Sequence, residues 1–157
     1  MKTNEQLLDT LNPQKKALFL EFLKRVQESG WNIIITQSYR TIKEQNDLHT
    51  LNNSNAMGGY SAHNYGFAID CNFEKGRLSL KKATDKGIWI CSGIPQIAEE
   101  CGLRWGGSFG NYYDPIHFDC VFNGETKRWN NYLIKTYGKD YDTIESNKIN
   151  WLFTKNT

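Results

Sequence analysis

Residues 59–72 read GYSAHNYGFAIDCN, and they place His63 and Asp70 seven positions apart with Gly66 between them. Seven residues rise about 10 Å along a helix and roughly 23 Å along a straight strand. Two ligands of one zinc ion lie only about 3–4 Å apart, because each bond to the metal is about 2 Å. If His63 and Asp70 share a metal ion, the chain must therefore fold back between them, and Gly66 permits such a turn.

The residues after Gly66 alternate in polarity, which is typical of a half-buried strand. One face of this strand carries the larger apolar side chains, namely Phe67, Ile69, Cys71 and Phe73. The other face carries Ala68, Asp70 and Asn72. Asp70 is therefore predicted to stand on a polar face, between two residues that are too small to cover it.

A second stretch, YDPIHFDCVF at residues 113–122, repeats this arrangement. Its apolar face carries Ile116, Phe118, Cys120 and Phe122, and its other face carries His117, Asp119 and Val121. If both strands belong to one sheet over a common core, Asp70 and His117 point to the same side, and His63 can enter from the loop. Two histidines and one carboxylate leave a coordination position open, which is typical of a catalytic zinc site. The spacing leaves open the alternative that these are ordinary hydrogen-bonding surface groups.

These motifs resemble those of the zinc peptidases that cut bacterial wall peptides. That group includes D-alanyl-D-alanine carboxypeptidases and dipeptidases, and the L-alanyl-D-glutamate endopeptidases of phage endolysins. The resemblance extends from about residue 10 to residue 122. It rests on four motifs in the same order and spacing, which are SYRT with a following EQ at 38–45, S-x-H-x6-D at 61–70, LRWGG at 103–107 and D-x-x-H at 114–117.

The resemblance implies an α+β fold with a small antiparallel central sheet flanked by helices and a zinc site on the sheet face. This is the D-Ala-D-Ala peptidase or Hedgehog-like fold. A length of 157 residues agrees with one domain. We expect a single zinc peptidase domain over residues 1–157, with its core at about 10–122 and with 123–157 as a C-terminal helical extension packed on it.

By the same resemblance, His63, Asp70 and His117 would bind Zn²⁺. Asp114 would be the general base for the attacking water, and Arg40 would polarise the scissile carbonyl or hold a substrate carboxylate. Three further residues would contact the substrate, namely Ser61, Gln45 and Tyr65.

The endopeptidase branch is favoured by the aspartate at position 114, since the carboxypeptidase branch usually has glutamate there. If Asp114 is not the base, Asp119 is the next candidate.

The leading interpretation is therefore a zinc metallopeptidase that hydrolyses the peptidoglycan stem peptide. Specifically, it would be an L-alanyl-D-glutamate endopeptidase that acts as a phage endolysin in host cell lysis. The alternatives are a D-alanyl-D-alanine carboxypeptidase, a non-enzymatic zinc-containing module that binds the wall or a protein partner, and a zinc hydrolase of another small peptide. Retention of both Asp114 and Arg40 disfavours the non-enzymatic module, because loss of peptidase function in such domains usually removes one of them.

Composition excludes several other classes of protein. A net charge of +2 with scattered basic residues does not favour nucleic-acid binding. No apolar run has the length of a signal peptide or a membrane span. We expect a monomer that is made in the host cytoplasm, does not insert into membranes, and acts on the cell wall after release.

The four cysteines form no CxxC motif, so we expect free thiols rather than a thiolate metal site.

Periodicity also predicts the main elements. Helices are expected over residues 13–28, 41–51, 95–101 and 125–137, and a further short amphipathic stretch over 144–153. Residues 31–36 are β-branched and apolar, so they are expected to form a buried strand that delivers Arg40 just beyond its end.

Overall fold

The computed structural model describes residues 1–122 and 124–138. Its centre is an antiparallel sheet in which the strands follow the order β1-β2-β5-β4, with β3 paired to β2. The strands are β1 (Asn32–Gln37), β2 (Ala68–Lys75), β3 (Leu78–Leu80), β4 (Arg104–Trp105) and β5 (His117–Asp119). This small antiparallel sheet flanked by helices confirms the predicted fold class.

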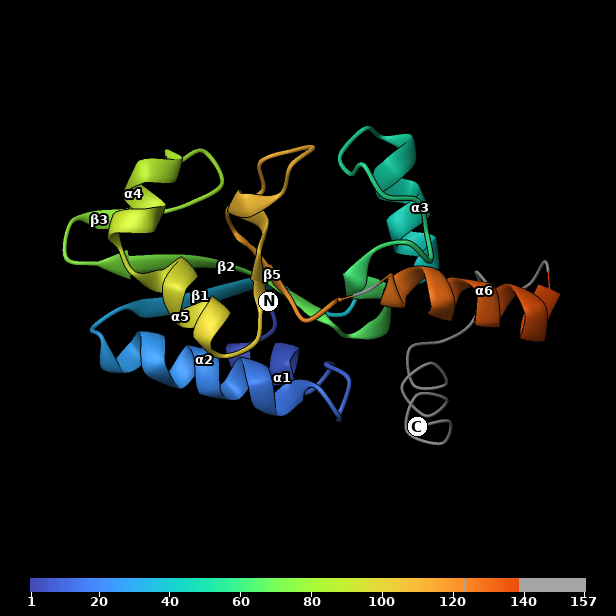
Figure 1. The fold of residues 1–157 in the computed structure, drawn as a ribbon, viewed down its shortest axis with the longest axis horizontal. Coiled ribbons are helices and arrows are strands. Elements are labelled where there is room, and N and C mark those ends of the chain that lie inside the picture. Colours follow the sequence, from blue (N-terminus) through green and yellow to red (C-terminus); the bar gives the residue numbers. More distant parts are fainter. Residues whose placement is uncertain (123, 139–157) are drawn as a thin grey trace.

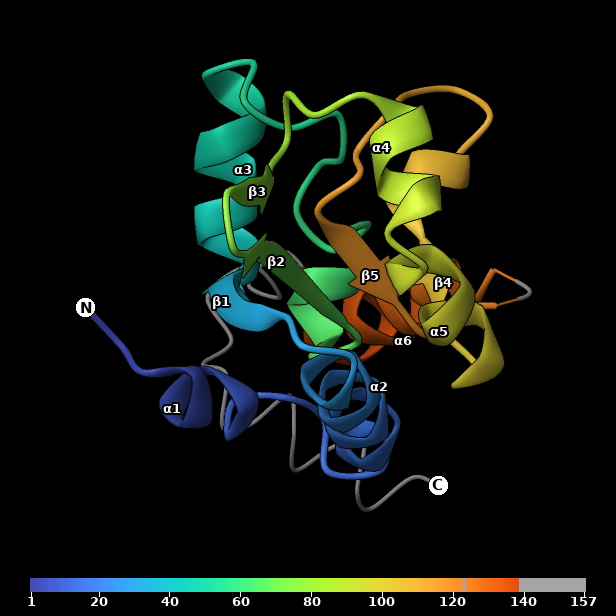
Figure 2. The same ribbon diagram turned by 90° about the vertical axis from the view of Figure 1, so that its left-hand side faces the viewer.

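Helices flank this sheet (Figures 1 and 2). They are α1 (Asn4–Leu8), α2 (Lys16–Glu28), α3 (Ile42–Thr50), α4 (Lys86–Cys91), α5 (Ile94–Glu100) and α6 (Glu125–Tyr137), with 3₁₀ turns η1 (Ala62–Tyr65) and η2 (Gly106–Ser108). Figures 1 and 2 show α2, α4 and α5 gathered near one part of the sheet, whereas α3 and α6 lie toward the opposite end of the molecule.

Aromatic side chains join the sheet to the helices that cover it. The Phe118 ring lies 4.9 Å from that of Phe22 on α2 and 6.3 Å from that of Trp89 on α4, measured between centroids. Phe73 on β2 packs against the same two rings. Because side chains alternate along a strand, burial of Phe73 and Phe118 on this face turns Asp70 and His117 to the other.

The predicted helices agree well with the observed ones. The helix expected at 125–137 matches α6, and the one expected at 41–51 matches α3. A capping box starts α3, since the Thr41 hydroxyl accepts from the Glu44 N–H and the Glu44 carboxylate accepts from the Thr41 N–H. The first long helix begins at Lys16 rather than at Pro13.

Two predictions about strands are wrong. Strand β1 is not buried, because it lies at the sheet edge and only Ile35 within it is fully covered. The Asn4 side chain closes that edge by donating to the Ile33 carbonyl (2.8 Å) and accepting from the Ile35 N–H (3.0 Å). Phe122 is 48% exposed rather than on the core face. The chain leaves the sheet after Asp119, whose carboxylate accepts the Val121 N–H in place of a strand partner.

The sequence also left out short elements that the structure contains. Strand β3 and helix α4 were not predicted from the sequence. The stretch expected at 144–153 lies outside the described residues. No helix within residues 1–122 and 124–138 is both long enough and apolar enough to cross a bilayer.

Candidate metal centre

A 3₁₀ turn and a glycine fold the chain back between His63 and Asp70. The Ser61 hydroxyl caps η1 by accepting from the His63 N–H. Gly66 ends the turn with φ +69°, a left-handed conformation that side chains other than glycine's rarely adopt. A Cβ at Gly66 would lie 2.5 Å from the Asn12 backbone nitrogen, so the close approach of two chain segments also requires glycine here.

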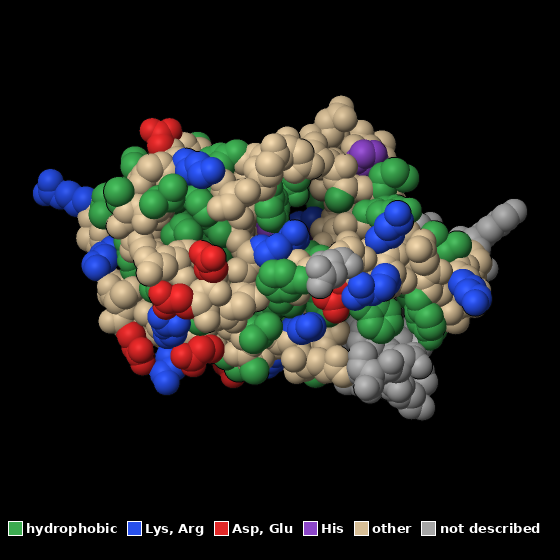
Figure 3. All heavy atoms as spheres, viewed as in Figure 1, with side chains coloured by type: hydrophobic (Ala, Val, Ile, Leu, Met, Phe, Trp, Pro, Cys, Tyr) green, Lys and Arg blue, Asp and Glu red, His purple; other side chains and the backbone are tan. Residues whose placement is uncertain are grey.

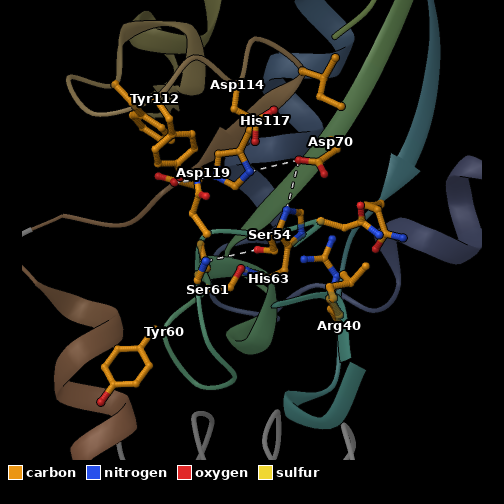
Figure 4. A pocket seen from close by; sticks show the side chains of 18 of the residues that line it. Arg40, Ser54, Tyr60, Ser61, His63, Asp70, Tyr112, Asp114, His117 and Asp119 are labelled. Atoms are coloured by element: carbon orange, nitrogen blue, oxygen red, sulfur yellow. Dashed lines mark hydrogen bonds and ion pairs between the residues drawn. The ribbon is translucent and has the colours of Figure 1, made fainter. Parts of the chain in front are cut away.

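The sheet register supplies the other half of the centre. Asp70 on β2 and His117 on β5 are directly paired across the antiparallel ladder. Asp70 Oδ1 lies 3.1 Å from His63 Nε2 and 3.1 Å from His117 Nδ1, and all three atoms lie within 4.8 Å of one another. Figure 4 shows the three side chains converging on one point.

This donor set fits a zinc ion. Two donor atoms on a tetrahedral zinc with bonds near 2.0–2.1 Å are about 3.3 Å apart, and the two N···O separations at Asp70 are close to that. Imidazole nitrogen and carboxylate oxygen are both zinc ligands, and three protein ligands leave one position open. The structure thus brings the three predicted ligands together, and their binding of zinc stays a prediction.

Both histidines are oriented by a partner on the ring nitrogen that faces away from Asp70. His63 Nδ1 donates to the Ser38 carbonyl oxygen at 2.6 Å. His117 Nε2 donates to Asp119 Oδ2 at 2.8 Å. The histidines are 3% and 8% exposed, so these contacts are shielded from water. Each contact leaves the other ring nitrogen directed at the common point.

The charges of the cluster shift its pKa values in opposite directions. Burial acts to raise the pKa of Asp70, but the adjacent His63 and His117 outweigh it and hold that pKa well below its usual range. Burial acts to lower the pKa of His117, but hydrogen bonds to Asp119 and Asp70 outweigh it and raise that pKa to about 10. In the absence of metal the site therefore favours an imidazolium between two carboxylates.

Asp114 lies beside His117 at the mouth of this cluster (Figure 4). The His117 N–H donates to the Asp114 carbonyl, so a short turn fixes the two residues relative to each other. Gly106 lets this turn approach, because a Cβ there would lie 2.2 Å from the Asp114 carbonyl oxygen. The buried Asp114 Oδ1 has no hydrogen-bond partner among the described residues, and such an atom is costly unless water or a ligand serves it.

Arg40 lies on the other side of the cluster, below His63 in Figure 4. Its backbone N–H donates to the His63 carbonyl, and its Nη1 donates to Gln45 Oε1 at 2.6 Å. Burial lowers the pKa of Arg40, against the opposing effect of Asp70 and other nearby carboxylates. No carboxylate in residues 1–122 or 124–138 forms an ion pair with Arg40 within 4.0 Å, so its charge is available to a ligand.

These residues open into a cleft of about 500 Å³. Figure 3 shows the hollow near the middle of one face, with basic side chains at its rim. Among the predicted site residues, the cleft is lined by Arg40, Ser61, His63, Asp70, Asp114 and His117. Residues 52–56, which are rich in asparagine, form part of its wall.

Gln45 and Tyr65, predicted to contact substrate, are not brought to the cleft. Both are fully buried. The Gln45 amide bonds Arg40, the Ser54 hydroxyl and the Ala56 carbonyl, while the Tyr65 hydroxyl donates to the Gly59 carbonyl. Their observed contacts support the loops around the site rather than a ligand within it.

From the sequence, Asp119 was considered only as the alternative general base, and no role was predicted for Arg104. Asp119 is 1% exposed and bonded to His117, Arg104 and the Val121 N–H. A carboxylate so engaged has no oxygen free for a water molecule. The alternation along the strand places Asp119 on the same face as His117, and this could have indicated a contact between the two. The contact of Asp119 with Arg104 on β4 depends on the sheet register, which the sequence does not show.

Comparison with known proteins identifies the same group of peptidases that the sequence motifs resemble. Residues 54–120 match a family model described as D-alanyl-D-alanine carboxypeptidase. The chain is 30% identical over 108 residues to the peptidoglycan L-alanyl-D-glutamate endopeptidase CwlK of Bacillus subtilis (strain 168). The aligned region covers 60% of this chain and 64% of that relative. The central part of the chain is thus similar to this peptidase family, and the chain spans a little under two thirds of the length of the CwlK relative. The family resemblance of its motifs is thereby confirmed.

Solved structures support the family fold. The L-Ala D-Glu endopeptidase ChiX of Serratia marcescens matches with a TM-score of 0.57 at 19% identity, over 78% of this chain and 89% of that one. The vancomycin-resistance D,D-dipeptidase VanXYg, solved with a D-Ala-D-Ala phosphinate analogue, matches with a TM-score of 0.51 at 16% identity, over 90% of this chain and 59% of that one. At such identities the likeness extends to the fold alone.

Proposed function

We propose that this protein is a zinc-dependent peptidase that cleaves the peptidoglycan stem peptide between L-alanine and D-glutamate. The observation that carries the proposal is the orphaned carboxylate oxygen of Asp114 beside the His63, Asp70 and His117 cluster. A carboxylate without a partner next to a metal-ligand set is suited to accept a proton from water. The similarity to CwlK, which is named for this cleavage, supports the choice of bond.

Each residue has a role that follows from its contacts. His63 Nε2, Asp70 Oδ1 and His117 Nδ1 would hold the zinc ion, which when bound supplies Lewis-acid polarisation and makes water more acidic. Asp114 takes the proton of the attacking water and returns it to the leaving amine. Arg40, whose guanidinium bonds the neutral amide of Gln45 and pairs with no carboxylate among the described residues, stabilises the negative charge that develops on the carbonyl oxygen.

Ser61 acts on the site through His63. Its hydroxyl accepts the His63 N–H, and its side chain is 9% exposed at the cleft wall. We propose that Ser61 positions the turn that carries His63. We also propose that its side chain contacts the substrate.

A D-alanyl-D-alanine carboxypeptidase is the second candidate, because the matching family model carries that description. The two activities share the metal ligands and differ in the part of the stem peptide that enters the cleft. The aspartate at position 114 favours the endopeptidase.

We also propose that the enzyme acts as a phage endolysin on the wall of its host. The support is the resemblance of the HNYGxAxD motif at 63–70 to the endopeptidase branch in which such lysins occur. Added to host cells whose membrane has been permeabilised, the protein is expected to lower culture turbidity, and Asp114→Ala is expected to leave it unchanged.

Mass spectrometry of purified peptidoglycan after digestion tests the proposal, with Asp114→Ala as the matched control. New amino-terminal D-glutamate on the stem peptides supports the endopeptidase, and free D-alanine selects the carboxypeptidase instead. Asp114→Ala is expected to bind zinc as the wild type does and to lose about 10²–10⁴-fold in kcat, the usual contribution of a general base. Near-normal turnover by this variant would remove Asp114 from that role.

A further inference from the structure

We propose that Asp119, held in place by Arg104, is a positioning residue that presents Nδ1 of His117 to the metal ion. The inference rests on the zinc site proposed above. It concerns two residues to which the proposed mechanism gives no part, although both line the same cleft.

The sheet aligns these residues in a row across three strands. Arg104 on β4 is paired with Asp119 on β5, and His117 on β5 is paired with Asp70 on β2. His117 and Asp119 are two positions apart and therefore share a face of the sheet. The row runs Arg104, Asp119, His117, Asp70, and each neighbour in it is bonded to the next.

Four N–H groups converge on the two oxygens of Asp119. Arg104 donates from Nε to Oδ1 at 2.7 Å and from Nη2 to Oδ2 at 2.8 Å. The Val121 backbone donates to Oδ1 at 3.2 Å, and His117 Nε2 donates to Oδ2 at 2.8 Å. An ionised carboxylate has about four acceptor sites and no donor, so this environment suits a carboxylate and would set the NH₂ group of an asparagine against a donor.

Because the acceptor sites of the Asp119 carboxylate are all occupied by N–H groups, this carboxylate determines which ring nitrogen of His117 carries the lone pair. With a metal ion bound, the imidazole of His117 is neutral and carries one N–H, and because Asp119 can only accept, that hydrogen must be on Nε2. The lone pair then lies on Nδ1, which is the atom directed at Asp70 and 3.1 Å from it. Carboxylates that accept from the second nitrogen of a metal-binding histidine fix its ring in this way.

Arg104 keeps the carboxylate in the required orientation. Its two parallel hydrogen bonds fix the plane of the Asp119 group, which a lysine could not do. The guanidinium also lies over the Phe109 ring at 5.1 Å, and that ring is 5.7 Å from the His117 ring. The same aromatic side chain thus packs against both Arg104 and His117, the two residues that Asp119 joins.

Zinc affinity, measured by competition with a chelator, tests this role on the full chain. Asp119→Ala is expected to weaken zinc binding by about 10–100-fold, the usual effect of removing such an outer partner. Arg104→Lys keeps the charge and is expected to weaken it by a smaller factor. Arg25→Lys is the matched control, since Arg25 pairs with Glu100 on helices away from the cleft, and its zinc affinity should equal that of the wild type.

A spectroscopic readout separates positioning from a general loss of structure. The chain has three histidines, so the Nε2–H signal of His117 in the zinc-loaded protein can be assigned by NMR with the aid of a His49→Gln variant. We expect this proton to exchange slowly with water in the wild type and rapidly in Arg104→Lys, whose altered side chain is partly exposed and should not prevent folding.

The outcomes distinguish this inference from the proposed function. Wild-type protein that binds no zinc contradicts the metal site itself. Wild-type binding with unchanged zinc affinity and unchanged Nε2–H exchange in both Asp119→Ala and Arg104→Lys contradicts only the role of Asp119 and Arg104. If Asp119→Ala does not fold, Arg104→Lys decides the question alone.

Discussion

The two histidines of the candidate centre are held in different ways. His63 sits in a short 3₁₀ turn that is fixed by contacts a few residues away, namely the Ser61 cap and the left-handed Gly66. His117 sits in a strand and is fixed by residues on two other strands, Asp70 and Arg104, the latter acting through Asp119. The turn that carries His63 therefore depends mainly on local backbone geometry, although its ring also bonds the distant Ser38 carbonyl. The position of His117 depends on the register of the sheet.

The largest expected effect comes from removing either histidine. His63→Ala and His117→Ala should both lose zinc and nearly all activity, as should Asp70→Ala. The metal-free proteins should differ, because His117→Ala leaves Asp70 and Asp119 without the imidazole between them, which costs about 3–5 kcal/mol for a broken buried pair. His63→Ala removes hydrogen bonds worth about 1–3 kcal/mol. Metal analysis and urea unfolding of chelator-treated protein measure both effects, and retained zinc in any variant would refute that residue as a ligand.

The dependence of protein stability on pH should reveal the protonation of His117. Its pKa is raised from 6.5 to about 10 in the metal-free protein, so the stabilisation it contributes is complete below pH 6.5 and is lost as pH rises toward 10. A metal ion on Nδ1 takes the place of that proton, so its binding strengthens as pH rises. We expect the difference in Tm between zinc-loaded and chelator-treated protein to widen from pH 6.5 to 10. A constant difference would contradict the assignment.

Gly66→Ala should disturb the turn that positions His63 and leave the strand that carries His117 unchanged. The left-handed conformation costs about 1–2 kcal/mol for a residue with a Cβ, and the overlap with the Asn12 nitrogen adds to it. Gly76→Ala is the matched control, since Gly76 has φ +59° but open space around it. Both variants should lower the free energy of unfolding, but only Gly66→Ala should also weaken zinc binding. Equal zinc affinities would show that the turn does not position His63.

Ser61→Ala should have the smallest effect. Loss of a capping hydroxyl typically costs about 1 kcal/mol, and here the hydroxyl accepts the N–H of a predicted ligand. Thr3→Ala removes a similar cap from α1, far from the cleft. Thermal unfolding should show a comparable loss in both, while kcat/KM should fall only in Ser61→Ala. A fall in kcat/KM for Thr3→Ala as well would attribute the effect to general stability.

Much of the site could be predicted because its signals are local. The alternation around Asp70 and around His117 assigned both residues to the polar face of a sheet, and the structure pairs them directly. Gly66 marked the reversal that returns His63 to them. The helix expected over residues 41–51 matches α3, which the structure shows to begin with a capping box at Thr41 and Glu44.

Prediction and structure differ where a residue's surroundings come from distant parts of the chain. Gln45 and Tyr65 were predicted to contact substrate, and packing buries both of them, so contact with substrate stays a prediction. The apolar run at 31–36 resembles a central strand, but whether a strand is central depends on what pairs with its second edge. Here that partner is the side chain of Asn4.

The order of residues in the chain was sufficient to predict the family, the fold class and the candidate ligands, because spacing and period reflect backbone geometry that extends over a few residues. Tertiary structure alone decided that Arg104 faces Asp119 and that one oxygen of Asp114 has no partner among residues 1–122 and 124–138. Those facts depend on strand register and on the close approach of segments such as Gly106 and Asp114. No local pattern encodes either, since both arise from packing the whole chain at once.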